Sequence, residues 1–383
     1  MAKKINVVSI DDGYHDYKLT DGEKDILLPG YSTEWVEPSK DDLEFDDKGQ
    51  IVPLSYIKAE TVIESTRGPE EYVRLVGSGA LEQDIDGSWN GSPNRHISPD
   101  FLVIFRTSLA LITPGEGDAV VDLLNMNLPV EYAENEERIE RLRKRVVGWH
   151  KIRLTLADGT VLEREINVKE LVTNSQPFAA YMSVILNDDG EISNRELAIG
   201  YNVLVDIGAR TQNAYGWEML KARRNLKMQS QDGIFTAYEA MAARIKTLQG
   251  KDTAIASIKI PQILKRGQVS NVSPAELEQI RDRSYEELAV KSVTRIESKM
   301  ATIENQVDNV IWGCGGGEVL EPFIREFMLD YPMIFLNRFS VARGGWKLAV
   351  RTYKERQAAE KAAKQAATPA KQVAAAKSEE VQS

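Results

Sequence analysis

Two similar segments, at residues 7–19 and 203–213, most constrain what this chain can fold into. The first reads VVSIDDGYHDYKL and the second reads VLVDIGARTQN. Each is a short apolar run typical of a buried strand, followed by an aspartate and, two residues later, a glycine. Glycine permits a sharp turn and leaves backbone N–H groups accessible to an anion. We therefore expect a duplicated α/β core, with a cleft between two lobes.

The aspartates at the two strand ends add a possible cation site. Asp11 and Asp206 could each hold a hydrated cation beside the bound anion. Two such turns facing each other would grip a polyphosphate and its magnesium from both sides. A single Asp-x-Gly is far more often a hairpin turn, so the interpretation depends on the order and spacing of the motifs.

A third segment, at residues 310–320, reads VIWGCGGGEVL and completes the pattern. It is a strand pattern that runs into glycines and then into a stretch of helical character. Because Gly315, Gly316 and Gly317 have no side chains, they can lie flat against a planar base.

These segments resemble the actin superfamily, and most closely the bacterial actin-like proteins of plasmid segregation, the ParM type. The first two look like the phosphate loops of that family, and the third looks like its adenosine loop. FSVARGGWK at residues 339–347 is similar to a segment near the end of plasmid-type actins. SQPFAAY at residues 175–181 is similar to the segment that carries the catalytic Gln or Glu. The resemblance spans roughly residues 5 to 352.

The resemblance implies an actin-like fold of class α/β, with two lobes, duplicated ribonuclease-H-like cores and a nucleotide cleft between them. ATP or GTP would bind there with Mg²⁺, which Asp11 and Asp206 would hold through its waters. Gln176 would orient the attacking water, and Lys18 would offer a point charge to the phosphates. The other expected nucleotide contacts are Asp12, Gly13, Tyr14, Gly208, Ala209, Arg210, Thr211, Asn213, Gly315, Gly316, Gly317 and Glu318.

The second loop departs from the family pattern at two positions. Actin-type loops usually read Asp-x-Gly-Gly-x-Thr-x-Asp, whereas this chain has Ala209 and Asn213. Alanine keeps the backbone amide but restricts the turn. Asparagine loses a charge that could steady the magnesium shell. These departures bear on the hydrolysis rate more than on nucleotide binding.

Composition narrows the function classes. The 383 residues are enough for two or three domains, and the net charge is 48 − 58 = −10. An acidic chain is a poor candidate for broad contact with DNA phosphates. The single cysteine, Cys314, excludes an internal disulfide and a cysteine-cluster metal site. No apolar run reaches transmembrane length and MAKKINVV is not a signal peptide, so we expect a cytoplasmic protein without membrane contact.

The expected organisation follows the chain in four parts. These are a first lobe at residues 1–195 with a variable insert at about 31–97, a second lobe at 196–330 with a helical insert at about 219–285, a return to the first lobe at 331–353, and residues 354–383. That last part is expected to be a helical extension that becomes a disordered tail beyond about Ala367.

Local patterns predict individual elements within these parts. Helices are expected at residues 99–113, 134–147, 176–187 and through most of 219–300, a buried strand at 119–124, and a hairpin at 150–170 with an Asp-Gly turn. Ser273 and Glu276 form a capping-box signature for the start of a helix.

The sequence therefore predicts a polymerising actin-like ATPase that segregates plasmid or phage DNA. Its partners would be other copies of itself and an adaptor protein bound to centromere-like DNA. Two alternatives share the core: a small-molecule kinase or chaperone, and a nucleotide-binding cell-division scaffold. A kinase needs a catalytic aspartate on the first lobe, and a chaperone needs a long domain where only a short tail follows Trp346. A scaffold usually has an amphipathic membrane helix, which this tail lacks.

Overall fold

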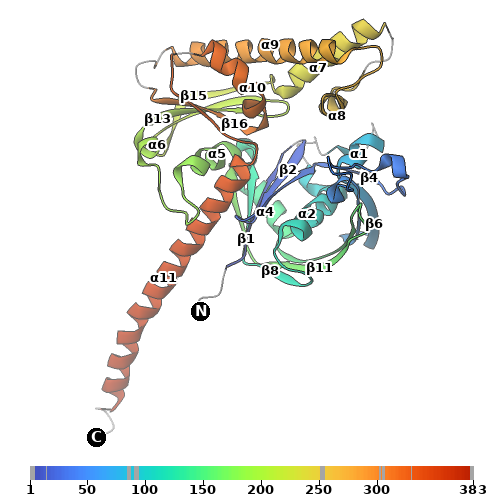
Figure 1. The fold of residues 1–383 in the computed structure, drawn as a ribbon. Coiled ribbons are helices and arrows are strands. Elements are labelled where there is room, and N and C mark those ends of the chain that lie inside the picture. Colours follow the sequence, from blue (N-terminus) through green and yellow to red (C-terminus); the bar gives the residue numbers. More distant parts are fainter. Residues whose placement is uncertain are drawn as a thin grey trace.

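The chain folds into two lobes, each built on a five-stranded sheet (Figure 1). The computed structural model describes residues 5–13, 15–83, 88–89, 95–250, 255–301, 303, 307–328 and 330–379. The first-lobe sheet has the order β12-β9-β1-β2-β3 and the second-lobe sheet has the order β15-β14-β13-β16-β17. Their bounds are β1 (Val7–Asp12), β2 (Asp16–Thr20), β3 (Asp25–Pro29), β9 (Leu123–Leu128) and β12 (Leu171–Ser175), then β13 (Tyr201–Ile207), β14 (Gln212–Glu218), β15 (Lys221–Ser230), β16 (Asn309–Gly313) and β17 (Met333–Phe335).

The two sheets share one topology. In each, the central strand (β1 or β13) begins an antiparallel meander with the next two strands and pairs on its other side with a parallel strand. A further parallel strand closes that edge, β12 in the first lobe and β17 in the second. The duplicated core is thereby confirmed, and the two Asp-x-Gly motifs lie at the ends of equivalent strands.

Helices cover both faces of these sheets, and this explains the continuous apolar runs of the central strands. All residues of β1, β9 and β13 are buried. Helix α2 (Pro99–Ile112) and helix α11 (Ser340–Glu379) pack against β1, whereas α10 (Cys314–Phe327) packs against β13. Helix α10 also contacts α9 (Pro274–Met300), which packs on α7 (Ile234–Gln249).

The insert forms a third sheet together with later parts of the first lobe. Its order is β7-β4-β6-β5-β10-β11-β8. The bounds are β4 (Tyr31–Glu34), β5 (Ile57–Ser65), β6 (Gly68–Val76), β7 (Ser88–Trp89), β8 (Ala119–Val121), β10 (Gly148–Thr155) and β11 (Val161–Val168), with short helices η1 (Lys40–Asp42), η2 (Pro53–Ser55), α1 (Ser78–Gln83) and η3 (Arg95–Ile97). The hairpin β10–β11 was predicted correctly. Through β5 and β10 the insert shares one sheet with the body of the lobe.

Most expected helices are present. Helices α2, α4 (Glu136–Val146), α5 (Gln176–Ile185), α7 and α9 lie where the pattern predicts them. The capping box at α9 is complete, since the Ser273 N–H donates to Glu276 Oε2 at 2.8 Å. The remaining short helices are α3 (Val130–Ala133), α6 (Arg195–Ile199), η4 (Ser257–Lys259) and α8 (Ile260–Arg266). In the part of the chain that the structure describes, no helix has the length and apolarity to cross a membrane.

Two predicted elements were wrong. The segment MLKARRNLKM was expected to be helical, but β15 occupies residues 221–230 because it completes the meander with β14. The single strand expected at 119–124 is two strands in different sheets. They separate at Asp122, whose carboxylate accepts hydrogen bonds from the Asn6 N–H at 3.2 Å and from Lys169 Nζ at 2.7 Å.

Two boundaries also differ from expectation. The second lobe extends beyond residue 330, because β17 pairs with β16. Helix α11 continues through Glu379 instead of ending near Ala367. Its Ala, Lys, Glu and Gln residues are all strong helix formers. In Figure 1 this helix projects from the body toward the C-terminus.

The lobes are joined where α11 crosses α5. A Cβ atom on Gly344 would lie 1.8 Å from the Ala179 carbonyl oxygen, so the two backbones touch there. Lys347 Nζ donates to the carbonyl oxygens of Ser183 at 2.9 Å and Leu186 at 2.7 Å. A buried cluster extends from this crossing to the face of the second-lobe sheet and includes Ala179, Tyr181, Leu204, Trp217, Ile311 and Val341.

Gly344→Ala should therefore destabilise the protein, although glycine-to-alanine changes inside helices usually stabilise by about 0.5–1 kcal/mol. The added methyl group overpacks the crossing, and we expect a loss of about 1–3 kcal/mol in the free energy of unfolding. Urea unfolding followed by circular dichroism measures it. Ala358→Ser, on an exposed part of the same helix, should change stability by less than about 0.5 kcal/mol. A stabilised Gly344→Ala variant would contradict the observed crossing.

Candidate functional site

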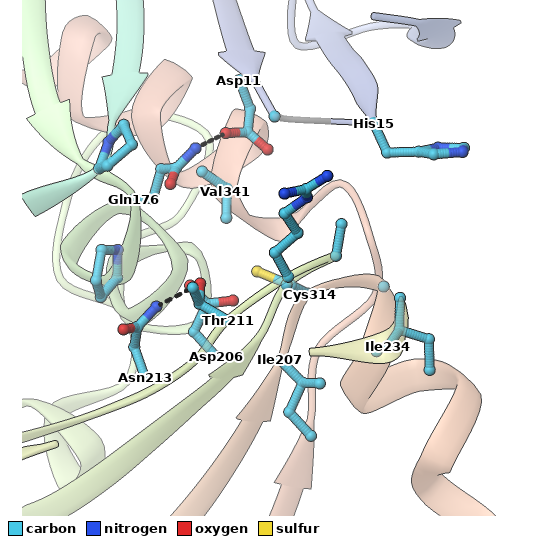
Figure 2. A pocket seen from close by; sticks show the side chains of 18 of the residues that line it. Asp11, His15, Gln176, Asp206, Ile207, Thr211, Asn213, Ile234, Cys314 and Val341 are labelled. Atoms are coloured by element: carbon cyan, nitrogen blue, oxygen red, sulfur yellow. Dashed lines mark hydrogen bonds between the residues drawn. The ribbon is translucent and has the colours of Figure 1, made fainter. Parts of the chain in front are cut away.

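A cavity of about 490 Å³ lies between the two lobes, at the carboxyl ends of β1 and β13 (Figure 2). Both Asp-x-Gly turns and the start of α10 line it. Of the residues predicted from sequence, those on the wall are Asp11, Gly13, Lys18, Gln176, Asp206, Gly208, Ala209, Arg210, Thr211, Asn213, Gly315 and Gly316. Tyr14 lies outside the described residues. The three motifs, far apart in sequence, therefore converge on one site.

Asp11 is the centre of the first-lobe wall. It is buried, and its Oδ1 accepts a hydrogen bond from Gln176 Nε2 at 2.8 Å, as Figure 2 shows. Its Oδ2 accepts from Lys18 Nζ at 3.2 Å. Burial raises the pKa of Asp11 above its usual range, although Lys18 and Gln176 both work in the opposite direction. Two other predicted functional groups, Gln176 and Lys18, therefore both contact Asp11.

Lys18 stays charged in spite of its burial. Burial lowers the pKa of a lysine, but Asp11 and Asp16 outweigh it and raise the pKa of Lys18. The Lys18 side chain is 15% exposed, and it reaches the cavity wall because Lys18 lies directly opposite Asp11 in the β1–β2 pairing. A buried cation at this place can bind an anion.

Among the described residues, none forms an ion pair with Asp206 as Lys18 does with Asp11. It is 8% exposed, and its Oδ1 is buried without a hydrogen-bond partner in the described structure. Burial, with a contribution from the charge of Asp11, raises the pKa of Asp206 to about 6, although the Cys314 thiol and Lys18 partly oppose this. The carboxylate would therefore gain from a cation placed in the cavity.

The second Asp-x-Gly turn is fixed against the start of α7. The carbonyl oxygens of Gly208 and Ala209 accept from the N–H groups of Ile234 at 3.0 Å and Phe235 at 2.9 Å. A Cβ on Gly233 would lie 2.5 Å from the Ala209 oxygen, so only glycine fits there. Helix α7 thus holds the turn in place.

Two polar side chains continue this wall into β14. Asn213 Nδ2 donates to Thr211 Oγ1 at 3.3 Å, and both side chains line the cavity (Figure 2). The predicted departures of the second loop, Ala209 and Asn213, therefore lie on the cavity wall.

The glycine run forms the first turn of α10 instead of a flat loop. A Cβ on Gly316 would lie 2.4 Å from Ile207 Cγ2, so the glycine allows α10 to approach β13. Gly315 has open space around it and lines the cavity, whereas Gly317 packs on the Trp312 backbone away from it. The turn begins at Cys314, which has φ of 63°. The N–H groups of a first helical turn lack helix partners and can bind a polar ligand.

Asp12 and Glu318 do not line the cavity, contrary to the prediction. The buried carboxylate of Asp12 contacts His96 Nε2 at 2.5 Å and Arg95 Nη2 at 3.2 Å. Burial would raise the pKa of Asp12, but Arg95 and His96 hold it below its usual range. Glu318 accepts from the Arg338 N–H at 2.9 Å near the surface. Successive side chains of a strand alternate in direction, which explains why Asp11 faces the cavity and Asp12 does not.

Sequence reasoning missed several wall residues. These include His15, Asp16, Tyr132, Arg138, Phe235, Tyr238 and Arg338. His15 and Asp16 stand inside the first motif, so its turn could have suggested them. The His15 ring meets the Phe235 ring edge-on at 5.7 Å, which is a contact between the lobes. Phe235 carries no sequence signal, because its place depends on how α7 folds back on the second turn.

Ion pairs between the insert and α8 bridge the lobes outside the cavity. Glu44 pairs with Lys265, and Glu82 Oε1 lies 2.6 Å from Arg266 Nη2. All four side chains are partly or largely exposed to solvent, so each pair contributes little by itself.

The wall fits a magnesium polyphosphate better than a bare metal ion. No group of three or more His, Cys, Asp or Glu side chains among the described residues could hold a metal. Asp11 and Asp206 provide carboxylate oxygens for Mg²⁺ that keeps several waters. Lys18, the glycine turns and the α10 start offer positive charge and N–H donors. The unpartnered Asp206 oxygen suits such a cation.

Comparison with known proteins confirms the actin-like fold that the resemblance implies. Residues 9–178 match the model of the actin like proteins N terminal domain. The ParM of a 15-stranded filament from Clostridium botulinum superposes with a TM-score of 0.68 at 16% identity, covering 91% of this chain and 99% of that one. Actin-like protein Alp7A gives 0.67 at 19% identity, covering 94% and 99%.

An archaeal actin homolog solved in complex with ADP gives a TM-score of 0.60 at 16% identity, covering 92% of this chain and 100% of its own. No curated protein sequence matches the chain. The fold is therefore actin-like over nearly the whole chain.

The raised pKa of Asp206 predicts a pH-dependent site. Below pH 6 this carboxyl group is mostly protonated and cannot attract a cation, whereas above pH 6 it is charged. Affinity for a magnesium nucleotide should therefore rise by up to about tenfold per pH unit below pH 6 and then level off. Isothermal titration calorimetry between pH 5 and 8 measures it.

Asp206→Asn is the control for this pH dependence, because the nucleotide phosphates titrate equally in both proteins. The variant should bind weakly and lose the Asp206 contribution to the pH profile. Equal pH profiles for parent and variant would exclude Asp206 from the cation site.

Proposed function

We propose that this chain is a polymerising actin-like ATPase whose filaments segregate plasmid or phage DNA. One observation carries the proposal: two equivalent Asp-x-Gly turns, from equivalent strands of two lobes, line one cavity together with Lys18. The likeness to a ParM filament protein and to Alp7A supports polymerisation. Neither neighbour exceeds 19% identity, so this activity is a proposal for the present chain.

ATP or GTP would lie between the lobes, with its phosphates held by the turns at Gly13 and Gly208. The Lys18 ammonium group would form an ion pair with the phosphates from the side of the first lobe. Asp11 and Asp206 would hold Mg²⁺ through water molecules. The bound metal would neutralise part of the negative charge of the phosphates. The α10 start at Gly315 would face the nucleoside.

Gln176 would orient the water that attacks the terminal phosphate. Its Nε2 donates to Asp11, so its amide oxygen remains to accept a hydrogen bond from water. Asp11 thereby fixes the direction of the amide while it holds the metal. The role needs a polar amide near the phosphate and not a strong base.

Nucleotide binding would couple to assembly through closure of the lobes. A ligand that contacts both lobes stabilises the closed arrangement, and a few kcal/mol of differential binding is enough to shift the population. The filament would form from copies of this chain in the cytoplasm. An adaptor protein would link it to centromere-like DNA, since the net charge of −10 disfavours direct contact with DNA.

Filament formation tests this function directly. Light scattering and negative-stain electron microscopy should show filaments after addition of Mg-ATP or Mg-GTP, and none without nucleotide or with EDTA. Bound nucleotide without filaments, at protein concentrations up to tens of micromolar, would reject polymerisation and favour a kinase or a scaffold.

Gln176→Ala should separate assembly from hydrolysis. The variant should bind Mg-ATP and polymerise, yet release phosphate roughly 10²–10⁴-fold more slowly, because it has lost only the water-positioning group. Its filaments should therefore persist. Phosphate release and the decay of light scattering measure the two effects. Gln229→Ala changes another glutamine of the cavity wall and should turn over near the parent rate. Parent-like turnover of Gln176→Ala would remove this residue from the mechanism.

A further inference from the structure

The predicted nucleotide ligand Asp12 has a different set of contacts from its neighbour Asp11. Its side chain is fully buried on the opposite side of β1, where the guanidinium of Arg95 is fully buried too. Arg95 Nε donates to Asp12 Oδ2 at 3.3 Å. The same guanidinium also reaches the main chain, since Nη2 donates to the Asp12 carbonyl oxygen at 2.8 Å. Arg95 therefore fixes both the side chain and the backbone of Asp12.

The backbone contact determines where the next N–H group points. The carbonyl of Asp12 and the N–H of Gly13 belong to one planar trans peptide, in which the two bonds point in opposite directions. The carbonyl points toward Arg95, outside the cavity. The Gly13 N–H consequently points away from Arg95, and Gly13 lines the cavity.

The turn itself is too tight for another residue at this position. A Cβ on Gly13 would lie 2.7 Å from the Asp16 carbonyl oxygen and 3.2 Å from Lys18 Nζ. Glycine can rotate its flanking peptides with little steric hindrance. A glycine amide therefore needs an external contact to hold one direction, and the Arg95 bond supplies it.

Arg95 is itself held by the segment in which the insert rejoins the lobe. Ser98 Oγ donates to the Arg95 carbonyl oxygen at 2.8 Å. Arg145 Nη1 donates to the Ile97 carbonyl oxygen at 2.8 Å, and its Nη2 donates to that of Ser98 at 3.1 Å. The His96 ring packs edge-on against Tyr132, which lines the cavity. These contacts hold the backbone that carries the Arg95 side chain in place.

We propose that Arg95 is a positioning residue for the first anion-binding turn: it aims the Gly13 N–H at the phosphates of the bound nucleotide. It acts through the Asp12 carbonyl and does not touch the ligand. This inference rests on the proposed nucleotide binding, but not on polymerisation. The contact to the carbonyl, and not the ion pair with the carboxylate, carries the function.

Arg95→Lys and Asp12→Asn separate these two contacts. Lysine keeps the charge, but its side chain ends one bond short of the position from which Arg95 Nη2 donates to the carbonyl. Asparagine weakens the ion pair and keeps the carbonyl. Mg-ATP affinity is measured with a fluorescent ATP analogue, below the concentration at which filaments form. Arg95→Lys should raise Kd about tenfold, the factor of one lost hydrogen bond. Asp12→Asn should lower Tm and change Kd by less than about threefold at a temperature well below melting.

Arg145→Lys is the matched control, because Arg145 holds the same segment without touching Asp12. Its Kd should equal that of the parent. An Arg145→Lys Kd as high as that of Arg95→Lys would show that packing of the segment matters, and would overturn the proposal. A tenfold effect of Asp12→Asn on Kd would also overturn it.

A second pair of variants decides the question if Arg95→Lys does not fold. Both lack the Asp12 carboxylate: Asp12→Asn with Arg95 unchanged retains the donor for the carbonyl, and Asp12→Asn with Arg95→Met does not. The variant that keeps Arg95 should bind Mg-ATP more tightly by about tenfold, and equal affinities would reject the role of the carbonyl contact. A parent that binds Mg-ATP without forming filaments would refute the proposed function alone, whereas a parent that binds no nucleotide would refute both.

Discussion

The burial of two carboxylates near each other is the constraint on which the rest of the site depends. Asp11 and Asp206 come from different lobes, and each is almost removed from solvent. Burial raises the pKa of both, and the charge of Asp11 adds to the shift at Asp206. Lys18 compensates only the first of them by a direct contact. Asp206 therefore keeps a buried oxygen without a hydrogen-bond partner among the described residues, and a hydrated cation on a polyphosphate would neutralise its charge.

The two halves of the site are built by one plan and differ in chemistry. In the first lobe, the cross-strand partner of Asp11 is Lys18, whereas in the second the partner of Asp206 is Asn213. Equivalent positions of the duplicated meander thus hold an ammonium group on one side and an amide on the other. Their different charges explain why one carboxylate is paired and the other is available for a cation. The two lobes therefore place their aspartates in the same way, and Lys18 and Asn213 make the charge around them different.

The motifs predict the cavity because they are local: a strand, an aspartate and a turn glycine stand within a few residues. The same reasoning placed Asp12 at the ligand, since two adjacent aspartates look alike until the strand direction assigns them to opposite faces. It also read residues 219–228 as helical, because their charges and leucine spacing allow it. Only the pairing with β14 makes them a strand. Arg95 could not be found this way, because its contact with Asp12 spans 83 positions of sequence.

The insert connects these observations. From the sequence, the insert was expected to be a variable addition to the first lobe. In the structure it contacts the second lobe, and its last residues contact the first Asp-x-Gly turn. Glu44 and Glu82 pair with α8 of the other lobe, so the insert contacts both lobes. Its last helix, η3, carries the guanidinium that fixes the Asp12 peptide. The insert thus contacts the second lobe and also holds the Asp12–Gly13 peptide. If Arg95 positions the first turn as proposed, a change of length or sequence inside the insert would alter the proposed nucleotide binding without changing any described residue of the cavity wall.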